Sequence, residues 1–249
     1  MSTQKPKNFD ALMNKYTEYI KNEHSLNILK DDYNNLSNVF DYEIDCAIKF
    51  LCELDFIRND ILSNNVVDYN ELKKDALTYK GVIASEINEC NELLMTMIIN
   101  KKMFDDLEPI EILPILALFI EDKKNDDNVF NKDNLPYKSV EIIENIKIMK
   151  RELESLLDKY NLYYNTELNL EFPEIAYKWG SGEKLQFIVN TYGIYEGNFI
   201  RNMQKINNIC VEIINICEIS NNHQLIPKMQ EIENLIIKDV VTFISLYIK

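Results

Sequence analysis

Glycine and proline are scarce in this sequence, with five glycines and six prolines among 249 residues. Folds rich in β-sheet need many such residues in their turns, so the composition favours helices. The apolar share of 46% and the charged share of 27% are ordinary for a globular protein. A chain of this length forms one large domain or two small ones, and either buries a proper core.

Cysteine and histidine are few as well. The five cysteines include no CxxC pair and there are two histidines, which excludes the usual zinc spacings and a disulfide framework. Cys210 and Cys217 lie seven residues apart among isoleucines, so we predict that they are core residues of a helix. His24 and His223 are predicted to face solvent. The sequence therefore indicates no metal site, no cofactor and a reducing intracellular location, nuclear or cytoplasmic.

Long apolar runs and phosphate-binding loops are absent from the sequence. No stretch reaches the roughly 18 apolar residues that a membrane span needs, so no membrane partner is predicted. The N-terminal residues lack the apolar core of a signal peptide. Neither GxxxxGK[ST] nor GxGxxG occurs, and no Ser-His-Asp set or carboxylate in an apolar setting stands out. The sequence predicts no catalytic residue and no enzymatic activity for the chain on its own.

The formal net charge is −14. A surface this acidic repels phosphate backbones and membrane anions, which excludes broad coating of nucleic acid. Any contact with RNA must therefore be local and depend on a few well-placed cations. The simpler alternative is that the acidic exterior only keeps the protein soluble.

The first 40 residues have a helical apolar rhythm. Apolar residues recur at steps of three, four or seven, which predicts one long amphipathic helix or two helices in line. These residues are Leu12, Tyr16, Tyr19, Leu26, Leu29, Tyr33, Leu36 and Phe40. Asp41 is predicted to cap a further helix. Its predicted buried stripe is Ile44, Ile48, Leu51 and Leu54.

Residues 41–90 have shorter and less regular patterns. Asn64–Asn65 followed by Val66–Val67 predicts a small hairpin, and Asp68 with Glu71 predicts the cap of a short helix. A helix, a second helix and a small wing in this order are compatible with part of a winged-helix domain.

Residues 91–249 are predicted to form a helical bundle, and the fold class is all-α. Pro109 is expected in the first turn of a helix that Pro114 kinks or restarts, and 121–137 is predicted to be a flexible loop. Further helices are predicted at 142–160, 172–179, 184–192, 199–217 and 225–247. The last two, joined by a short turn, are predicted to lie antiparallel and to cover each other's apolar stripes.

One segment of this acidic chain is basic. Arg201 and Lys205 lie four residues apart and therefore on one face of a predicted helix, and Lys178 and Lys184 precede them. The helix follows a short helix and a glycine-bearing link, an arrangement that projects side chains and helix-end amides toward a phosphate or a base.

Aromatic residues accompany these cations. Trp179, Tyr192 and Tyr195 are candidate stacking surfaces for single-stranded RNA. The alternative is that the aromatic residues plug the core and the cations are ordinary surface residues.

At these residues the sequence resembles a known family. Glu196–Arg201, read as E-G-N-F-I-R, is similar to the E-G-x-x-I-R segment of the DSHCT domain. This is the C-terminal domain of superkiller-type and related exosome-associated DExH RNA helicases. Similar segments follow the family's order at 54–57 (LDFI), 80–87 (KGVIASEI), 104–109 (FDDLEP), 174–179 (EIAYKW) and 238–248 (KDVVTFISLYI).

The resemblance implies an architecture and a role. It implies a winged-helix-like remnant at 41–90, a DSHCT-type bundle at 91–249 and, for residues 1–40, the returning helix of the family's arch stalk. In the family, RNA threads a channel closed by two RecA-like motor domains, a winged helix and this bundle. The RNA-binding residues implied by resemblance are Arg201, Lys205, Glu174, Trp179, Lys184 and Gly197.

The sequence also departs from the family. The motor domains are absent, so ATP hydrolysis and unwinding are not available to this chain by itself. Lys205 stands where the family prefers arginine, which loses the planar fork that stacks on a base. Val82 and Asn198 differ from the family as well, and these changes bear on RNA contact more than on the fold.

Three hypotheses follow for the function of the chain. The first is a helicase accessory module that binds single-stranded RNA or completes a separate motor subunit. The second is a docking scaffold of a larger RNA-processing or transcription assembly. The third is that the chain is part of a full helicase.

Overall fold

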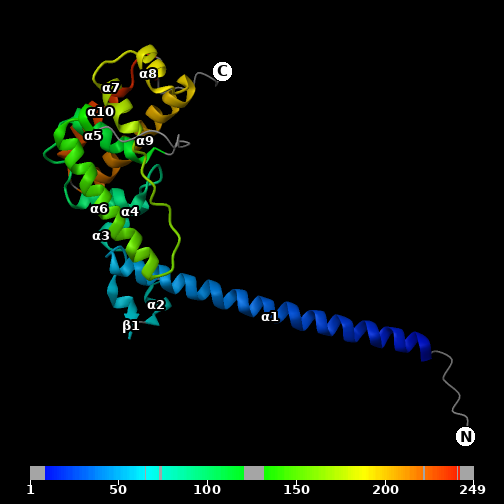
Figure 1. Ribbon diagram of the computed structural model, residues 1–249. Helices are drawn as coiled ribbons and strands as arrows, with labels where there is room; N and C mark the ends of the chain where they lie inside the picture. The colour runs from blue at the N-terminus through cyan, green and yellow to red at the C-terminus, as the bar shows by residue number, and fades with distance from the viewer. Residues whose placement is uncertain are drawn as a thin grey trace, which may run out of the picture.

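The computed structural model describes residues 9–64, 66–72, 75–120, 132–220, 222–239 and 241. One long helix projects from a helical body, and the only strands in the described residues are β1 and β2, so the fold is all-α (Figure 1). The helices are α1 (Phe9–Glu53), α2 (Tyr69–Leu72), α3 (Tyr79–Ser85), α4 (Glu92–Asn100), α5 (Pro109–Leu116), α6 (Tyr137–Lys159), α7 (Phe172–Gly180), α8 (Leu185–Tyr192), α9 (Glu196–Ser220) and α10 (Leu225–Ile236). None of the described helices is long and apolar enough to cross a bilayer.

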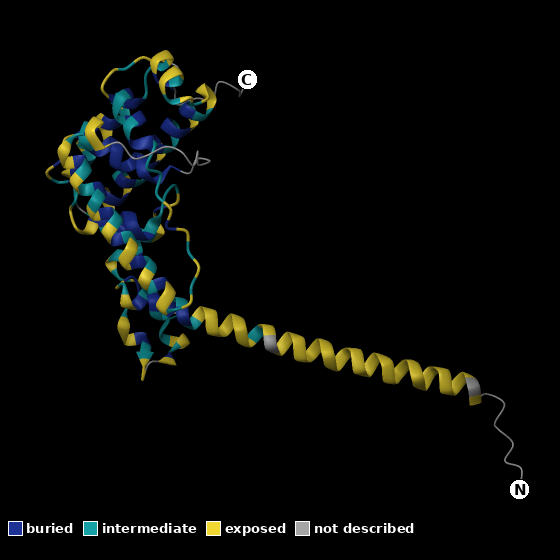
Figure 2. Ribbon diagram, in the orientation of Figure 1, coloured by how far each residue is buried: buried dark blue, intermediate teal, exposed yellow. Residues whose placement is uncertain are grey.

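Helix α1 runs without a break through 45 residues. The prediction that Asp41 caps a second helix is therefore wrong. Asp41 lies inside the helix because no glycine or proline interrupts the chain between Pro6 and Gly81. We call residues 9–44 the arm; its side chains are almost all exposed (Figure 2), including Ile44, which was expected to be buried.

A small module packs on the last two turns of α1. The predicted hairpin is confirmed: β1 (Leu62–Ser63) pairs antiparallel with β2 (Val66–Val67). The predicted cap is confirmed as well, because Asp68 Oδ1 accepts hydrogen bonds from the N–H groups of Asn70, at 2.9 Å, and Glu71, at 3.3 Å. The module's core is Ile48, Cys52, Ile57, Ile61, Val67 and Ala76. The winged-helix reading of this segment and the arch-stalk reading of residues 1–40 stay predictions.

Helices α3 and α4 connect this module to the rest of the body. Gly81 allows the backbone of α3 to lie close to the backbone of Phe56, since a Cβ at Gly81 would lie 2.2 Å from the carbonyl oxygen of Phe56. The two helices are separate, since α3 ends at Ser85 and α4 begins at Glu92. Ile87, Leu94 and Ile98 are buried.

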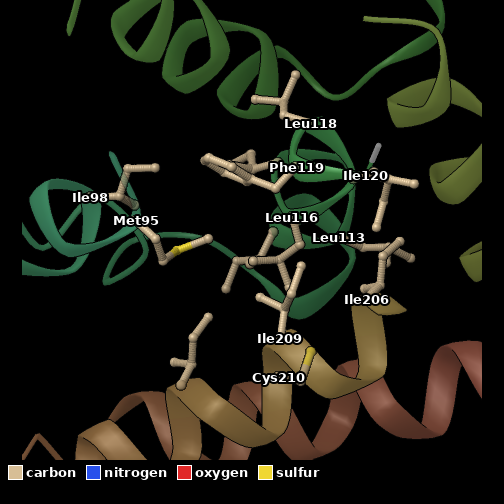
Figure 3. Close-up of a cluster of buried hydrophobic side chains, with 14 of the residues drawn as sticks. Met95, Ile98, Leu113, Leu116, Leu118, Phe119, Ile120, Ile206, Ile209 and Cys210 are labelled. Carbon is tan, nitrogen blue, oxygen red and sulfur yellow. The ribbon is translucent and has the colours of Figure 1, made fainter. Parts of the chain in front are cut away.

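Helix α5 forms the centre of the body. Pro109 occupies its first turn as predicted, and two residues after the internal Pro114 the α-helix gives way to a 3-10 turn, Ala117–Phe119. Figure 3 shows side chains of this segment packed against α4 and α9. The residues labelled there are Met95, Ile98, Leu113, Leu116, Leu118, Phe119, Ile120, Ile206, Ile209 and Cys210.

Helix α6 covers the predicted helix at 142–160 but begins five residues earlier, at Tyr137, which was expected to end the preceding loop. Most of the predicted loop at 121–137, namely 121–131, lies outside the described residues. Within the described part, Lys132–Asn134 forms a 3-10 turn.

Helices α9 and α10 follow each other closely in the sequence, with a turn at 223–224 between them, and they pack side by side. Cys210 and Cys217 are buried in the core, and His24 and His223 are exposed, all as predicted. The predicted helix at 225–247 is too long, because α10 ends at Ile236. The backbone then leaves helical geometry, with a positive φ of 52° at Asp239, and 242–249 lies outside the described residues.

Candidate nucleic-acid interface

Three helices in succession build the candidate face. After α7 the chain turns at Gly182, where φ is +99°, and Lys184 precedes α8. Gly193, with φ of +63°, ends α8 in the left-handed region, where glycine has no Cβ to clash. Three residues later, at Glu196, α9 begins, and the carbonyl of Tyr195 accepts the N–H of Phe199 at 2.9 Å. The two glycine turns therefore separate α7, α8 and α9.

Arg201 is the most accessible cation of α9. Its side chain is exposed in the second turn, whereas Lys205, one turn further on, is half-buried. Within the part of the chain that the structure describes, neither cation forms an ion pair. The predicted shared helix face is present, but only its N-terminal end is fully open to solvent.

The surroundings of Lys205 are acidic. Asn208 and Glu212 lie further along the same face of α9. Asn208 donates a hydrogen bond to Glu89 Oε1 at 3.2 Å. The Glu212 carboxylate accepts backbone N–H groups of Asn88 and Glu89, each at 3.1 Å. A phosphate approaching Lys205 therefore meets two carboxylates nearby.

Trp179 is completely buried, so its ring offers no face to an RNA base. Its indole packs edge-on against Phe199, with 5.1 Å between the ring centroids, and donates Nε1–H to the carbonyl of Ile236 at 2.9 Å. Lys238 Nζ lies 4.7 Å from the Trp179 ring centroid and donates to the Trp179 carbonyl at 2.6 Å. For Trp179 the alternative reading holds: this aromatic residue plugs the core.

Glu174 links the turn before α6 to α7 and α8. Its Oε1 accepts Asn134 Nδ2–H at 2.6 Å and the Tyr192 hydroxyl at 2.8 Å. Burial and then this hydrogen bond to a carboxylate raise the pKa of Tyr192. Both side chains are thus engaged inside the protein, and what Glu174 does here is hold α8 on α7.

Two exposed aromatic side chains flank the cations. Tyr195, a predicted stacking residue, is 81% exposed, and Phe187 of α8 is 46% exposed. Sequence reasoning missed Phe187. The signal was present, because Phe187 lies next to the buried Ile188 and so points away from the apolar side of a short helix.

Gly197 lies in the first turn of α9 in open space. A Cβ added there would meet no atom within 4 Å. Packing therefore does not require glycine at this position, although glycine costs a helix stability relative to alanine. The small residue leaves the backbone of the first turn open to a close neighbour.

A helical body that carries exposed cations and aromatic rings at one end is found in a known family of protein domains. The sequence profile of the DSHCT (NUC185) domain matches residues 74–244, and the chain is a member of that family, as the resemblance predicted. The match extends over α3 to α10 and includes every residue of the candidate face.

Three of the relatives that the chain matches are named as helicases, two of them as ATP-dependent RNA helicases. It is 26% identical over 95% of its length to DExH-box ATP-dependent RNA helicase DExH11 of Arabidopsis thaliana. It is 26% identical over 97% of its length to ATP-dependent RNA helicase mtr4 of Schizosaccharomyces pombe, and 26% identical over 68% to antiviral helicase SKI2 of Saccharomyces cerevisiae. The chain spans 18%, 21% and 14% of these three proteins, so it corresponds to their DSHCT-containing part.

Proposed function

We propose that this chain is a non-catalytic module that guides single-stranded RNA along the exposed end formed by α8 and α9. The observation that carries the proposal is an exposed Arg201 with Lys184 and Tyr195 on neighbouring elements, in a chain whose net charge is −14. Cations in that setting bind phosphates, and an exposed ring stacks on a base without sequence preference. Membership of an RNA-helicase domain family supports the same role.

The six residues implied by resemblance divide into two roles in this proposal. Arg201 and Lys184 contact phosphate, Lys205 contributes less because Glu89 and Glu212 lie near it, and Gly197 lets the RNA backbone come close. Glu174 and Trp179 are positioning residues. Glu174 holds α8 on α7, and Trp179 anchors the end of α7 against α9 and the segment after α10.

The test is fluorescence anisotropy with a labelled oligouridine at low salt. We expect weak, salt-sensitive binding that falls about ten-fold or more in Arg201→Glu/Lys205→Glu, with a shallower salt dependence. The single Arg201→Glu change should account for most of the loss, because Lys205 already has carboxylates beside it.

The matched control is Lys101→Glu/Arg151→Glu, which changes the net charge equally at two exposed cations, one just after α4 and one in α6. It should weaken binding about two-fold through the overall field alone. Equal losses in both double variants would show that RNA senses only net charge, and the assignment of the α8–α9 end would fail.

A second candidate is completion of a separate helicase motor, and one observation favours it. The chain spans only about a fifth of the first helicases that it matches. Such a role predicts that a motor-only helicase of the same source binds this chain and unwinds RNA better in its presence. A motor whose unwinding rate is unchanged by saturating amounts of this chain would exclude it.

A further inference from the structure

The arm of α1 presents a long apolar face that no described part of the chain covers. It extends about 53 Å at the ordinary helical rise and stands clear of the body (Figures 1 and 2). Soluble proteins rarely leave so large a contiguous apolar surface open unless it is an interface. The exposed large apolar residues of the arm are Phe9, Leu12, Met13, Tyr16, Tyr19, Ile20, Leu26, Ile28, Leu29, Tyr33, Leu36, Val39, Phe40, Tyr42 and Ile44.

Eight of these fifteen side chains lie on two rows of a heptad repeat. One row recurs every seven residues and is apolar throughout: Leu12, Tyr19, Leu26, Tyr33 and Phe40. A second row, three residues before or four after the first, is apolar at both ends and charged in the middle: Phe9, Tyr16, Glu23, Lys30, Ser37 and Ile44. We call these two rows the seam. A seam of period 3.5 that persists this long is typical of a helix paired in a left-handed coil.

The charges inside the seam select the partner and its direction. If a second arm lies antiparallel, with Leu12 of one copy level with Ile44 of the other, Glu23 lies within about 4.5 Å along the axis of the other copy's Lys30. The same pairing occurs twice, by symmetry. In the same register Lys15, beside the seam, approaches the other copy's Glu43, also twice. A parallel pair in register would instead place Glu23 beside Glu23 and Lys30 beside Lys30.

The position of the body favours the same direction. The arm joins the body at its C-terminal end, where Tyr69 donates to Asp45 and Lys159 donates to Glu53. An antiparallel pair places the two bodies at opposite ends of the coil, whereas a parallel pair places both at one end. The bodies therefore do not obstruct an antiparallel pair.

We propose that the arm is a homodimerisation element, which pairs antiparallel with the arm of a second copy of this chain. The proposal uses residues outside the candidate nucleic-acid face, so it stands or falls independently of RNA binding. Residues 9–44 of each copy form one half of the interface. The interface has two-fold symmetry, because each Glu23–Lys30 pair, each Lys15–Glu43 pair and the apolar row occur identically on both copies.

Sedimentation equilibrium tests the interface. We expect a dimer at about 100 µM, where a helix pair with a micromolar dissociation constant is filled. Leu26→Lys/Tyr33→Lys should give a monomer with unchanged helix content, because lysine is a good helix former. The matched control is Ile28→Lys/Tyr42→Lys, on the opposite side of the same helix at similarly exposed positions. It should remain a dimer.

A charge exchange tests the direction. Lys30→Glu places a carboxylate beside Glu23 of the other copy and should raise the dissociation constant about ten-fold. Glu23→Lys together with Lys30→Glu restores opposite charges only in the antiparallel pair, and should return the constant to near the parent value. A monomeric parent, a dimer that survives Leu26→Lys/Tyr33→Lys, or a charge exchange without rescue would each overturn the proposal.

Discussion

The arm of α1 and helix α5 are both rich in apolar residues, but they are buried to opposite extents. In α5, six of eight residues are buried, because its apolar side chains point in every direction and α6, α7 and α10 surround it. The arm carries an apolar stripe along the seam together with further apolar side chains elsewhere, and those side chains are exposed. A helix that is apolar all round is placed in a core, whereas a striped helix needs one partner on one side.

The difference also locates the stability of the molecule. Core residues of the body contact one another across several helices, so each removed side chain leaves a cavity. The large apolar side chains of the arm are exposed, and the arm is held as a helix by propagation from its root on the hairpin module. Substitutions should therefore separate the two regions.

The largest difference in the free energy of unfolding is expected between Trp179→Ala, in the body, and Tyr33→Ala, in the arm. Removing the completely buried indole should lower the free energy of unfolding by about 3–5 kcal/mol. Removing the exposed Tyr33 ring should change it by less than about 0.5 kcal/mol at concentrations where the chain is monomeric. Urea unfolding followed by far-ultraviolet circular dichroism measures both variants. Tryptophan fluorescence cannot be used for this purpose, because Trp179 is the only tryptophan and Trp179→Ala removes it. A large loss for Tyr33→Ala would mean that the arm packs on the body.

Elements with a clear local signal could be predicted from the sequence. The period of α6, the proline at the start of α5 and the glycine turns around α8 are all local features, and the structure contains each of them. The continuity of α1 through Asp41 was missed because a capping residue is equally tolerated inside a helix when nothing else breaks it. The end of α10 was missed because Lys238 and Ile236 bond to Trp179, which is far away in the sequence.

The candidate site was predictable only in part, for the same reason. That Arg201 and Lys205 share a face follows from their spacing alone. The carboxylates near Lys205 come from Glu89, more than a hundred residues earlier, and from Glu212. The hydrogen bond that engages Glu174 comes from Tyr192 after a turn. Sequence spacing therefore gives the face of a helix, and tertiary packing decides which of its groups remain available.

An intermediate effect on stability is expected when alanine replaces either of two glycines, Gly81 in crowded surroundings and Gly197 in open space. In Gly81→Ala the new methyl would lie 2.2 Å from the Phe56 carbonyl oxygen, which also accepts the Thr78 N–H. The backbone must shift, and the cost should be about 1–3 kcal/mol. In Gly197→Ala the methyl meets open space, so helix propensity should stabilise the protein by up to about 1 kcal/mol.

Thermal unfolding of the two alanine variants checks this contrast. The melting temperature should fall for Gly81→Ala and stay level or rise for Gly197→Ala. The second variant also sharpens the functional reading: a lower RNA affinity in a protein that is no less stable would indicate that RNA approaches the first turn of α9. Destabilisation by Gly197→Ala would contradict the open surroundings of this residue.

The smallest effect is expected where α1 and α6 meet. The Glu53 carboxylate accepts hydrogen bonds from Lys159 Nζ, at 2.6 Å, and from the Tyr160 hydroxyl, at 2.6 Å. These hydrogen bonds lower the pKa of Glu53 from its ordinary value of 4.5. A carboxyl whose pKa is lowered by folding stabilises the folded state above its unfolded pKa, and this contribution is lost as the pH falls through the folded pKa. Because the groups are exposed to water, the contribution is small.

Hydrogen exchange at the junction isolates this contribution. The difference in exchange between Glu53→Gln and the parent should be present at neutral pH. It should shrink as the pH falls below about 4.5 and vanish below the lowered pKa of the folded state, because the protonated parent then resembles the amide. Glu152→Gln, at an exposed position of α6, is the control and should show no such pH dependence at residues 50–53 and 157–160. A difference that persists at low pH would mean that the junction depends on packing, such as the edge-on contact of Phe50 with Tyr160, and not on the ionised carboxylate.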